Sequence, residues 1–180
     1  MRGAEEVLEF WFVEHGQDDW FGGEAAFDAR LAAGFADTHV AVARGEAWKW
    51  RRTAAGRLAE IIVLDQFSRQ LYRGSPLAFA QDPMALALAQ EAVAGGHDLE
   101  IDADRRTFVY MPYMHSESLL IHEEAVRLFT ALGKQETLDY ELAHVEVLRR
   151  FGRYPRRNAA LGRQSPPEEI DYMDSGEGMF

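Results

Sequence analysis

The chain has 180 residues, 47% of them hydrophobic and 12% aromatic, which is typical of a single globular domain with a substantial core. Its net charge of -11 argues against non-specific nucleic-acid binding, and the lack of cysteine excludes disulfides, thiol catalysis and cysteine-based zinc sites. No segment reaches the roughly 18 apolar residues of a membrane span and the start has no signal-peptide pattern, so we expect one cytoplasmic domain over residues 1–180, with no nucleic-acid or membrane partner.

Helical periodicity runs through the first half of the sequence, and strand alternation is almost absent. Residues 4–13 and 24–44 have the apolar spacing of helices, and we expect a loop over residues 16–23 between them. The longest apolar helix is predicted over Thr53–Tyr72, with Gly74 just past its end. Its apolar positions are numerous enough to predict deep burial.

The second half continues the helical pattern. Ser75-Pro76 and Asp82-Pro83 are typical helix starts, because proline at the first helical position loses no hydrogen bond. Further helices are predicted over Asp104–Tyr110, where Pro112 halts the helix, from a cap at Ser116 to about Leu132, and over residues 137–151 and 165–173. We therefore predict an all-α fold of about seven to nine helices in one domain.

Six arginines lie within the sixteen residues of Leu148–Arg163. Guanidinium groups this close repel one another unless carboxylates or a bound anion neutralise them, so the segment is either an internal ion-pair hub or an anion site. As a hub, it would neutralise carboxylates such as Asp65 and Glu117. As a site, its Arg153 and Arg157 would face a phosphate or carboxylate.

A second polar group lies in the predicted Thr53–Tyr72 helix. Asp65, Arg69 and Arg73 are spaced at i, i+4 and i+8, so Asp65 and Arg69 can pair directly on one face. Gln66 adds a neutral donor and acceptor, and polar groups in so apolar a helix need partners. The group is either structural or part of a ligand site.

A third polar group surrounds the predicted end of the helix at Pro112. His115 titrates near neutral pH and can form an acid/base pair with Glu117, while the amides after Ser116 would present a helix N-terminus to an anion. In the alternative interpretation, Ser116 and Glu117 cap a helix and His115 bonds a loop carbonyl.

The sequence gives little support for a metal or a cofactor. Glu141 and His144 have the Glu-x-x-His spacing of di-iron bundles, and His122 lies seven residues after His115, but such a bundle needs a second copy and two more glutamates. The chain has no P-loop or dinucleotide fingerprint. We predict no metal and no cofactor.

Four phrases occur in order along the chain: IIVLDQFSRQLYRG, AFAQDPMALALA, FVYMPYMHSES and RFGRYPRRNAALGR, which begin at Ile61, Ala78, Phe108 and Arg150. Together they resemble the bacterial domain of unknown function 924 family. The resemblance implies a tetratricopeptide-repeat-like superhelical fold and brings no catalytic residues. The chain has Arg156 where the family's last motif is expected to have a histidine, which implies that this position is not a required general base.

Two functions remain open. The preferred one is a binding module that holds an anionic small molecule or an acidic peptide. Its ligand-binding residues would be Arg69, Arg73, Arg153, Arg157, Asn158 and Gln66. The alternative is an enzyme acting on a phosphorylated or carboxylated metabolite, with His115 as the general acid and base and Glu117 or Asp65 orienting it.

Overall fold

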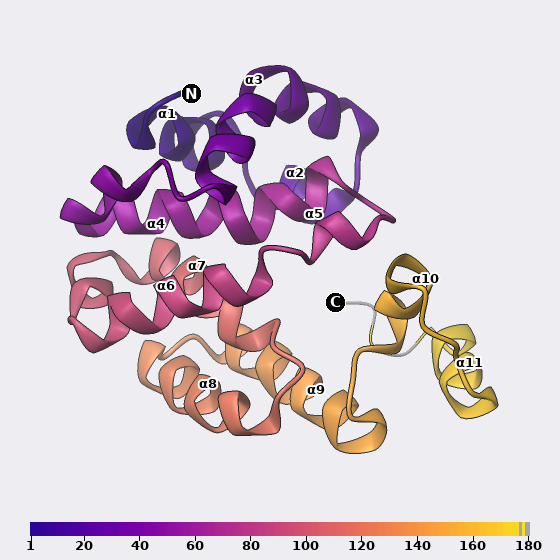
Figure 1. The fold of residues 1–180 in the computed structure, drawn as a ribbon. Helices are drawn as coiled ribbons and strands as arrows, with labels where there is room; N and C mark the ends of the chain where they lie inside the picture. Colours follow the sequence, from indigo (N-terminus) through magenta and orange to yellow (C-terminus); the bar gives the residue numbers. More distant parts are fainter. Residues whose placement is uncertain (177, 179–180) are drawn as a thin grey trace.

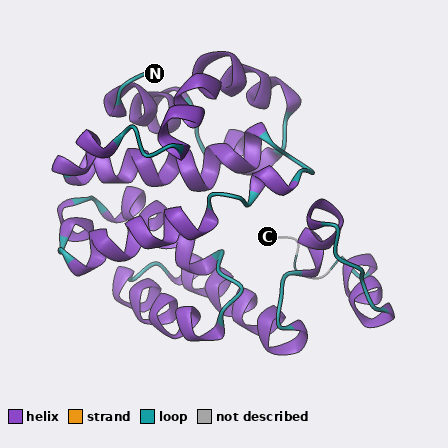
Figure 2. Ribbon diagram, in the orientation of Figure 1, coloured by secondary structure: helices purple, strands orange, loops and turns teal. Residues whose placement is uncertain are grey.

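The computed structural model describes residues 1–176 and 178, and these residues contain helices and no strand (Figures 1 and 2). The α-helices are α1 (Ala4–Glu9), α2 (Gln17–Gly22), α3 (Ala25–Ala43), α4 (Ala54–Ile62), α5 (Ser68–Leu71), α6 (Asp82–Ala94), α7 (Ala103–Met114), α8 (Leu119–Leu132), α9 (Gln135–Phe151), α10 (Asn158–Leu161) and α11 (Pro167–Asp174). Short 3-10 or π turns are η1 (Phe10–Glu14), η2 (Trp48–Arg52), η3 (Val63–Phe67), η4 (Pro76–Ala78), η5 (His97–Glu100) and η6 (Pro155–Arg157). The predicted all-α fold is confirmed.

The helices stack in layers. Figure 1 shows α1–α5 in one layer, α6 and α7 below it, and α8 and α9 below these, with α10 and α11 to one side. From α6 onward each long helix packs on the next, α6 on α7, α7 on α8 and α8 on α9, while α4 contacts both α6 and α7. The more specific prediction of a tetratricopeptide-repeat-like superhelix stays a prediction.

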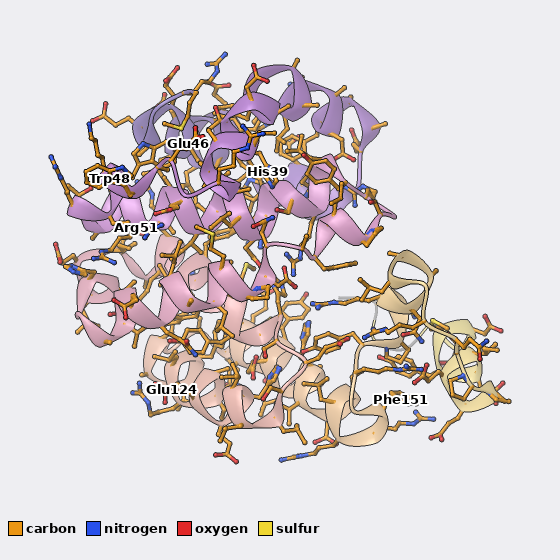
Figure 3. All side chains as sticks on the ribbon, in the orientation of Figure 1. His39, Glu46, Trp48, Arg51, Glu124 and Phe151 are labelled. Atoms are coloured by element: carbon orange, nitrogen blue, oxygen red, sulfur yellow. The ribbon has the colours of Figure 1, made fainter. Side chains whose placement is uncertain are left out.

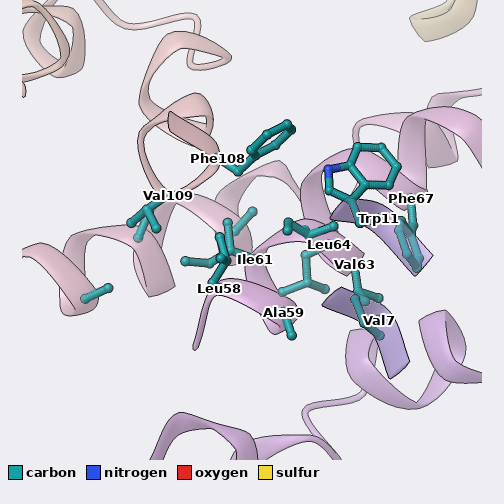
Figure 4. Close-up of a cluster of buried hydrophobic side chains, with 14 of the residues drawn as sticks. Val7, Trp11, Leu58, Ala59, Ile61, Val63, Leu64, Phe67, Phe108 and Val109 are labelled. Atoms are coloured by element: carbon teal, nitrogen blue, oxygen red, sulfur yellow. The ribbon is translucent and has the colours of Figure 1, made fainter. Parts of the chain in front are cut away.

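The core is organised around one continuous helix made of α4, η3 and α5, which spans most of the predicted Thr53–Tyr72 helix. Thr53 begins it, because its side-chain oxygen accepts a hydrogen bond from the Gly56 amide at 3.0 Å. Its apolar side chains are buried, and Trp11 packs on Phe67 at 5.6 Å between ring centres (Figure 4). Each large apolar side chain buried here stabilises the fold by roughly 1.5–3 kcal/mol.

The π turn η3 places polar residues inside this helix. Asp65 is 1% exposed and Gln66 is 5% exposed, although they lie in the most apolar stretch of the chain. Because buried polar groups need partners, the packing of α7 and α6 against this helix decides where those partners come from.

Three local predictions were wrong. Residues 17–22 form α2 instead of a loop, because two acidic residues in its first turn suit a helix N-terminus and Gly23, with φ +68°, ends it. Pro112 lies inside α7 and does not halt it, since packing on α6 and α8 compensates for one missing backbone bond. Helix α8 begins at Leu119 with Ser118 at the N-cap position, so Ser116 caps no helix.

The chain after α9 forms a C-terminal arm, residues 152–176 and 178, which carries α10 and α11. It shares with α9 a small apolar cluster of Val147, Leu148, Tyr154 and Tyr172 that is separate from the main core. Side chains fill the space between the arm and α7–α9 (Figure 3). The arm is therefore held against the main body largely by contacts between side chains. Some of these contacts, those of Arg157, belong to the candidate site.

The part of the chain that the structure describes contains no candidate for a membrane-spanning helix. None of these helices is both long and apolar enough to cross a bilayer.

Candidate functional site

The candidate site is centred on His115, which ends α7, and Asp65, which lies on η3. The His115 Nδ1 atom lies 2.7 Å from Asp65 Oδ1. An ionised carboxylate only accepts hydrogen bonds, so Nδ1 carries the proton and donates it to Asp65. This bond fixes the orientation and the tautomer of the imidazole, and it leaves Nε2 as the basic nitrogen.

Asp65 is held in its ionised form by the groups around it. Burial raises its pKa, but the charge of Arg69 and the hydrogen bond from His115 outweigh burial and hold the pKa below its usual value. Arg69 Nη1 lies 3.0 Å from Asp65 Oδ1, and Gln66 donates to Oδ2 at 2.5 Å. The carboxylate therefore has a donor for each oxygen and needs no water.

The second nitrogen of His115 is available for chemistry. Among the described residues, none makes a hydrogen bond to His115 Nε2. This atom is also not fully enclosed by the protein. The side chain is 16% exposed. Burial and the nearby charge of Arg69 lower the pKa of His115, although Asp65 opposes them, so the imidazole is neutral at pH 7 and Nε2 can accept a proton.

Two arginines meet one carboxylate beside His115. Arg69 makes a bidentate pair with Asp82, the first residue of α6, at 3.0 and 3.1 Å, and Arg157 reaches the same carboxylate at 3.3 Å. The Arg157 guanidinium also lies 4.7 Å from the ring centres of both Phe79 and Tyr154. Burial and the charge of Arg69 lower the pKa of Arg157.

The charges of this group balance. Asp65 and Asp82 carry two negative charges, and Arg69 and Arg157 carry two positive ones. The side chains of Arg69, Asp82 and Arg157 are 19%, 17% and 14% exposed, so solvent reaches the edge of the group but not Asp65, at 1%. An anion can bind here only by taking the place of a carboxylate that is already present.

The arginine-rich segment holds the turn that carries His115. The carbonyls of residues 114–116 accept hydrogen bonds from Tyr154 Oη at 2.7 Å, from Arg157 Nη2 at 2.9 Å and from His122 Nε2 at 2.8 Å, in that order. Two of these three donors, Tyr154 and Arg157, belong to the arm. The arm therefore fixes the position of His115 through its backbone.

Glu117 anchors the same turn from its other side. Its carboxylate accepts hydrogen bonds from Arg163 Nη1 and Nη2 at 2.7 and 2.9 Å and from the Tyr154 amide at 2.8 Å. Burial raises the pKa of Glu117, but the Arg163 hydrogen bonds and charge, the Tyr154 amide and the charge of Arg157 together outweigh burial and lower the pKa. Because Glu117 is engaged in this way, the partner of His115 is Asp65, which was the second of the two orienting groups considered from the sequence.

Behind the turn, His122 and Glu141 form a buried pair. His122 Nδ1 lies 2.6 Å from Glu141 Oε1, and the other Glu141 oxygen, Oε2, is enclosed with no hydrogen-bond partner among the described residues. Burial raises the pKa of Glu141 and lowers that of His144 to about 3. Over residues 1–176 and 178, no three histidine, aspartate or glutamate side chains are grouped to hold a metal.

The structure brings together five of the nine site residues predicted from the sequence: Asp65, Gln66, Arg69, His115 and Arg157. They come from η3, α5, the end of α7 and the arm, and Asp82 joins them. We call these six residues the His115 site.

Three of the predicted ligand-binding residues lie elsewhere. Arg73 pairs with Asp28 of α3 at 2.9 and 3.0 Å. Arg153 pairs with Glu169 of α11 at 2.8 and 2.9 Å, and Asn158 donates to the same carboxylate at 2.6 Å. These residues stabilise the arm or the α3–α5 contact and do not face His115.

Sequence reasoning missed three contributors to the site. Asp82 was noted only as a helix start, and Phe79 and Tyr154 were not considered as partners of an arginine. The sequence did contain one indication of Asp82, because its carboxylate lies in the family-like phrase AFAQDPMALALA. No signal connected it to Arg69 and Arg157, because those contacts depend on tertiary packing.

Comparisons with known proteins agree with this architecture. Residues 7–177 match the family model described as "Bacterial protein of unknown function (DUF924)". The structure of a protein of unknown function, ATU0120 from Agrobacterium tumefaciens, is similar, with a TM-score of 0.90 and 38% identity over 96% of this chain and 97% of that one. No curated protein matched the chain.

Proposed function

The chain belongs to DUF924, a family of bacterial proteins of unknown function, and we propose that it is an enzyme acting on a carboxylated or phosphorylated small molecule, with His115 as general base and acid. The observation that carries the proposal is the pairing of His115 Nδ1 with the buried Asp65 at 2.7 Å while Nε2 has no partner among the described residues. A carboxylate that orients a neutral imidazole in this way is the arrangement a proton-transfer catalyst needs.

The proton transfer has a simple route. Nε2 takes a proton from a hydroxyl group or a water molecule, the imidazole becomes positive, and Asp65 stabilises that charge through Nδ1. The lowered pKa of His115 favours the neutral form before the step and the return of the proton after it. Asp65 acts as a positioning residue, because it contacts His115 and not the substrate.

The two arginines supply recognition of an anion. Arg69 and Arg157 share Asp82, and a phosphate or carboxylate of a substrate can replace this carboxylate on Arg157 while Asp82 keeps its bidentate pair with Arg69. Arg157 also donates to the His115 carbonyl at 2.9 Å, so an anion on Arg157 lies next to the histidine backbone. In this proposal, the arginine that recognises the anion therefore lies next to the histidine that transfers the proton.

The experiment is a turnover screen. The purified protein is incubated with a panel of phosphorylated and carboxylated metabolites, and products are followed by mass spectrometry. We expect His115→Ala to abolish turnover of any substrate found, and Arg157→Ala to weaken its binding. Arg149→Ala is the matched control, because Arg149 is in the same arginine-rich segment but is exposed and, among the described residues, pairs with Glu146.

A second candidate is the binding module preferred from the sequence, which holds an anionic small molecule or an acidic peptide without changing it. The specific observation in its favour is the seating of Arg157 between the rings of Phe79 and Tyr154, which prepares a planar cation for a carboxylate. Calorimetry with the same panel distinguishes the two functions. In a module, His115→Ala leaves affinity unchanged and no panel member is converted. If neither variant changes anything but stability, both functions are wrong.

A further inference from the structure

His122 of α8 and Glu141 of α9 form a pair that the protein encloses completely. Their side chains are 1% and 0% exposed, and His122 Nδ1 lies 2.6 Å from Glu141 Oε1. The proposed function uses neither residue. Because a buried ionisable pair often stabilises a fold no better than apolar residues of the same size, its role is to be sought in what else it contacts.

The second nitrogen of His122 contacts the turn that carries His115. His122 Nε2 lies 2.8 Å from the Ser116 carbonyl and 3.1 Å from Tyr154 Oη. A carbonyl oxygen only accepts, and the Tyr154 hydroxyl donates its own hydrogen to the Met114 carbonyl at 2.7 Å. Both groups therefore need a hydrogen on Nε2, so His122 is a donor at this nitrogen.

The two contacts of His122 together need two hydrogens. The contact with Ser116 needs one on Nε2, and the contact with Glu141 needs another between Nδ1 and Oε1. An ionised glutamate beside a neutral histidine has only one hydrogen for both contacts. The pair must therefore hold one additional proton, because without it one of the two contacts would bring two acceptors face to face.

The enclosed oxygen of Glu141 shows where the additional proton lies. Oε2 is buried and has no hydrogen-bond partner among the described residues. In a carboxylate, this oxygen would share the negative charge without a donor, which is costly away from solvent. In a carboxylic acid, Oε1 donates to Nδ1 and Oε2 is an uncharged carbonyl oxygen. Burial favours the same form, since it raises the pKa of Glu141.

We propose that Glu141, as a neutral carboxylic acid, and His122 form a proton-dependent clamp on the turn that carries His115. While the additional proton is present, His122 donates to the Ser116 carbonyl and the turn is held. When a base in the solvent takes this proton, the remaining hydrogen moves to Nδ1, where it meets the Glu141 carboxylate. Nε2 then becomes an acceptor, and the Ser116 carbonyl loses its donor. As regulation of the His115 site, the clamp rests on the proposed function.

The groups around the pair do not supply this proton. The titratable neighbours are His144 on α9, Tyr154 of the arm and His115 at the end of α7. Burial lowers the pKa of His144 to about 3 and raises that of Tyr154, so both are neutral around pH 7 to 9. The charged groups nearby are Arg69, Arg157 and Glu117. Each of these three is held in an ion pair of its own.

Nitrogen NMR of the imidazole rings at pH 7 tests where the proton lies, because it distinguishes a neutral imidazole with its hydrogen on Nε2 from an imidazolium. We expect the neutral form of His122 in the wild type. Glu141→Gln should give the same form, because a glutamine amide also donates to Nδ1. An imidazolium at His122 in the wild type would overturn the proposal, since Glu141 would then be ionised.

Exchange of the Ser116 amide hydrogen tests the clamp itself. This amide donates to the Tyr113 carbonyl at 3.2 Å, so its exchange reports whether the turn is held. Rates are divided by those of an unstructured peptide at each pH and compared between about pH 6.5 and 9.5, because buried glutamates can keep their proton to about pH 8–9. We expect exchange in the wild type to accelerate about tenfold over this range, consistent with one lost hydrogen bond.

Glu141→Gln keeps the donor and has no proton to lose, so its Ser116 exchange should not accelerate. Glu136→Gln, an exposed change of the same kind on α9, should behave as the wild type does. Glu141→Leu removes the donor and should exchange fast at every pH; if it does not fold, the wild type and Glu141→Gln decide the question without it.

Three results would overturn the clamp: no acceleration in the wild type, equal acceleration in Glu141→Gln, or equal acceleration of the Ile62 amide in α4, which would indicate general unfolding. These experiments do not measure turnover. A failed turnover screen therefore leaves the clamp standing, and a failed clamp leaves the assignment of His115 as general base to the turnover screen.

Discussion

Replacing Asp65 by asparagine tests the centre of the His115 site, because it removes the charge of the buried carboxylate and keeps its shape. Asp65 is 1% exposed and interacts with His115 at 2.7 Å, Arg69 at 3.0 Å and Gln66 at 2.5 Å. Removing one partner of a buried ion pair costs about 3–5 kcal/mol. Arg69 keeps its bidentate pair with Asp82, so we expect the lower end, a loss of about 3 kcal/mol in the free energy of unfolding at pH 7.

The loss should depend on pH with a definite sign. The pKa of Asp65 is lowered in the folded protein, so its charge stabilises the fold above the unfolded pKa of about 3.9, and this stability is lost as pH falls toward the folded pKa. Through Asp65 alone, each pH unit below about 3.9 removes about 1.4 kcal/mol of stability from the wild type, and Asp65→Asn lacks this contribution. Between pH 7 and pH 3 the gap between the two proteins should therefore narrow by about 1 kcal/mol.

The assay is urea unfolding followed by circular dichroism at both pH values, with Asp171→Asn as an exposed control of the same chemistry. The control should match the wild type at both. A loss below about 1 kcal/mol at pH 7 would mean that the pair with Arg69 and His115 contributes no more than a surface pair. A gap that stays constant between pH 7 and pH 3 would mean that the fold does not lower the pKa of Asp65. A gap that widens as pH falls would mean that Asp65 is protonated in the fold, and the assigned role of His115 Nδ1 would fail with it.

Other predictions concern the buried glutamate, the arm and the core helix. Burial raises the pKa of Glu141, so the stability of the wild type relative to Glu141→Gln should fall as pH rises above about 4.3, as urea unfolding of both proteins from pH 4 to 8 would show. Arg157→Lys keeps the charge but loses the planar contacts, and calorimetric melts should show about 2 kcal/mol less stability, with Arg149→Lys unchanged. Gly56→Ala places a methyl group against a backbone carbonyl of η2 and should cost about 3 kcal/mol in urea unfolding, whereas Gly34→Ala, with its nearest neighbour at 4.0 Å, should be neutral or slightly stabilising.

The sequence predicted what depends on local spacing. The all-α fold, the long buried helix and the Asp65–Arg69 pair follow from periodicity and from the i, i+4 rule, and the structure contains all three. The same rule failed for Arg73, because α5 ends at Leu71 and the side chain turns to Asp28 of α3. Local spacing is informative only while the helix continues.

The contacts that make the His115 site were out of reach of such rules. His115 and Asp65 are separated by 50 residues and meet because α4, η3 and α5 pack near α7. Asp82 serves two arginines, one 13 and one 75 residues away. A pattern search weighs residues near one another in sequence, and a carboxylate at a helix start gives no sign of which distant guanidinium it will meet.

The charge balance of the site also bears on the choice between an ion-pair hub and an anion site. Each arginine of the site already pairs with a carboxylate, as the ion-pair hub requires. The two arginines are not bound equally, because Arg157 reaches Asp82 through one nitrogen at 3.3 Å, whereas Arg69 binds the same carboxylate through two nitrogens at 3.0 and 3.1 Å. A ligand anion that takes over Arg157 would leave Asp82 in its bidentate pair with Arg69, and it would add negative charge to a group that is balanced without it. The two interpretations therefore describe one arrangement before and after a ligand arrives, and Arg157 is the residue whose partner changes.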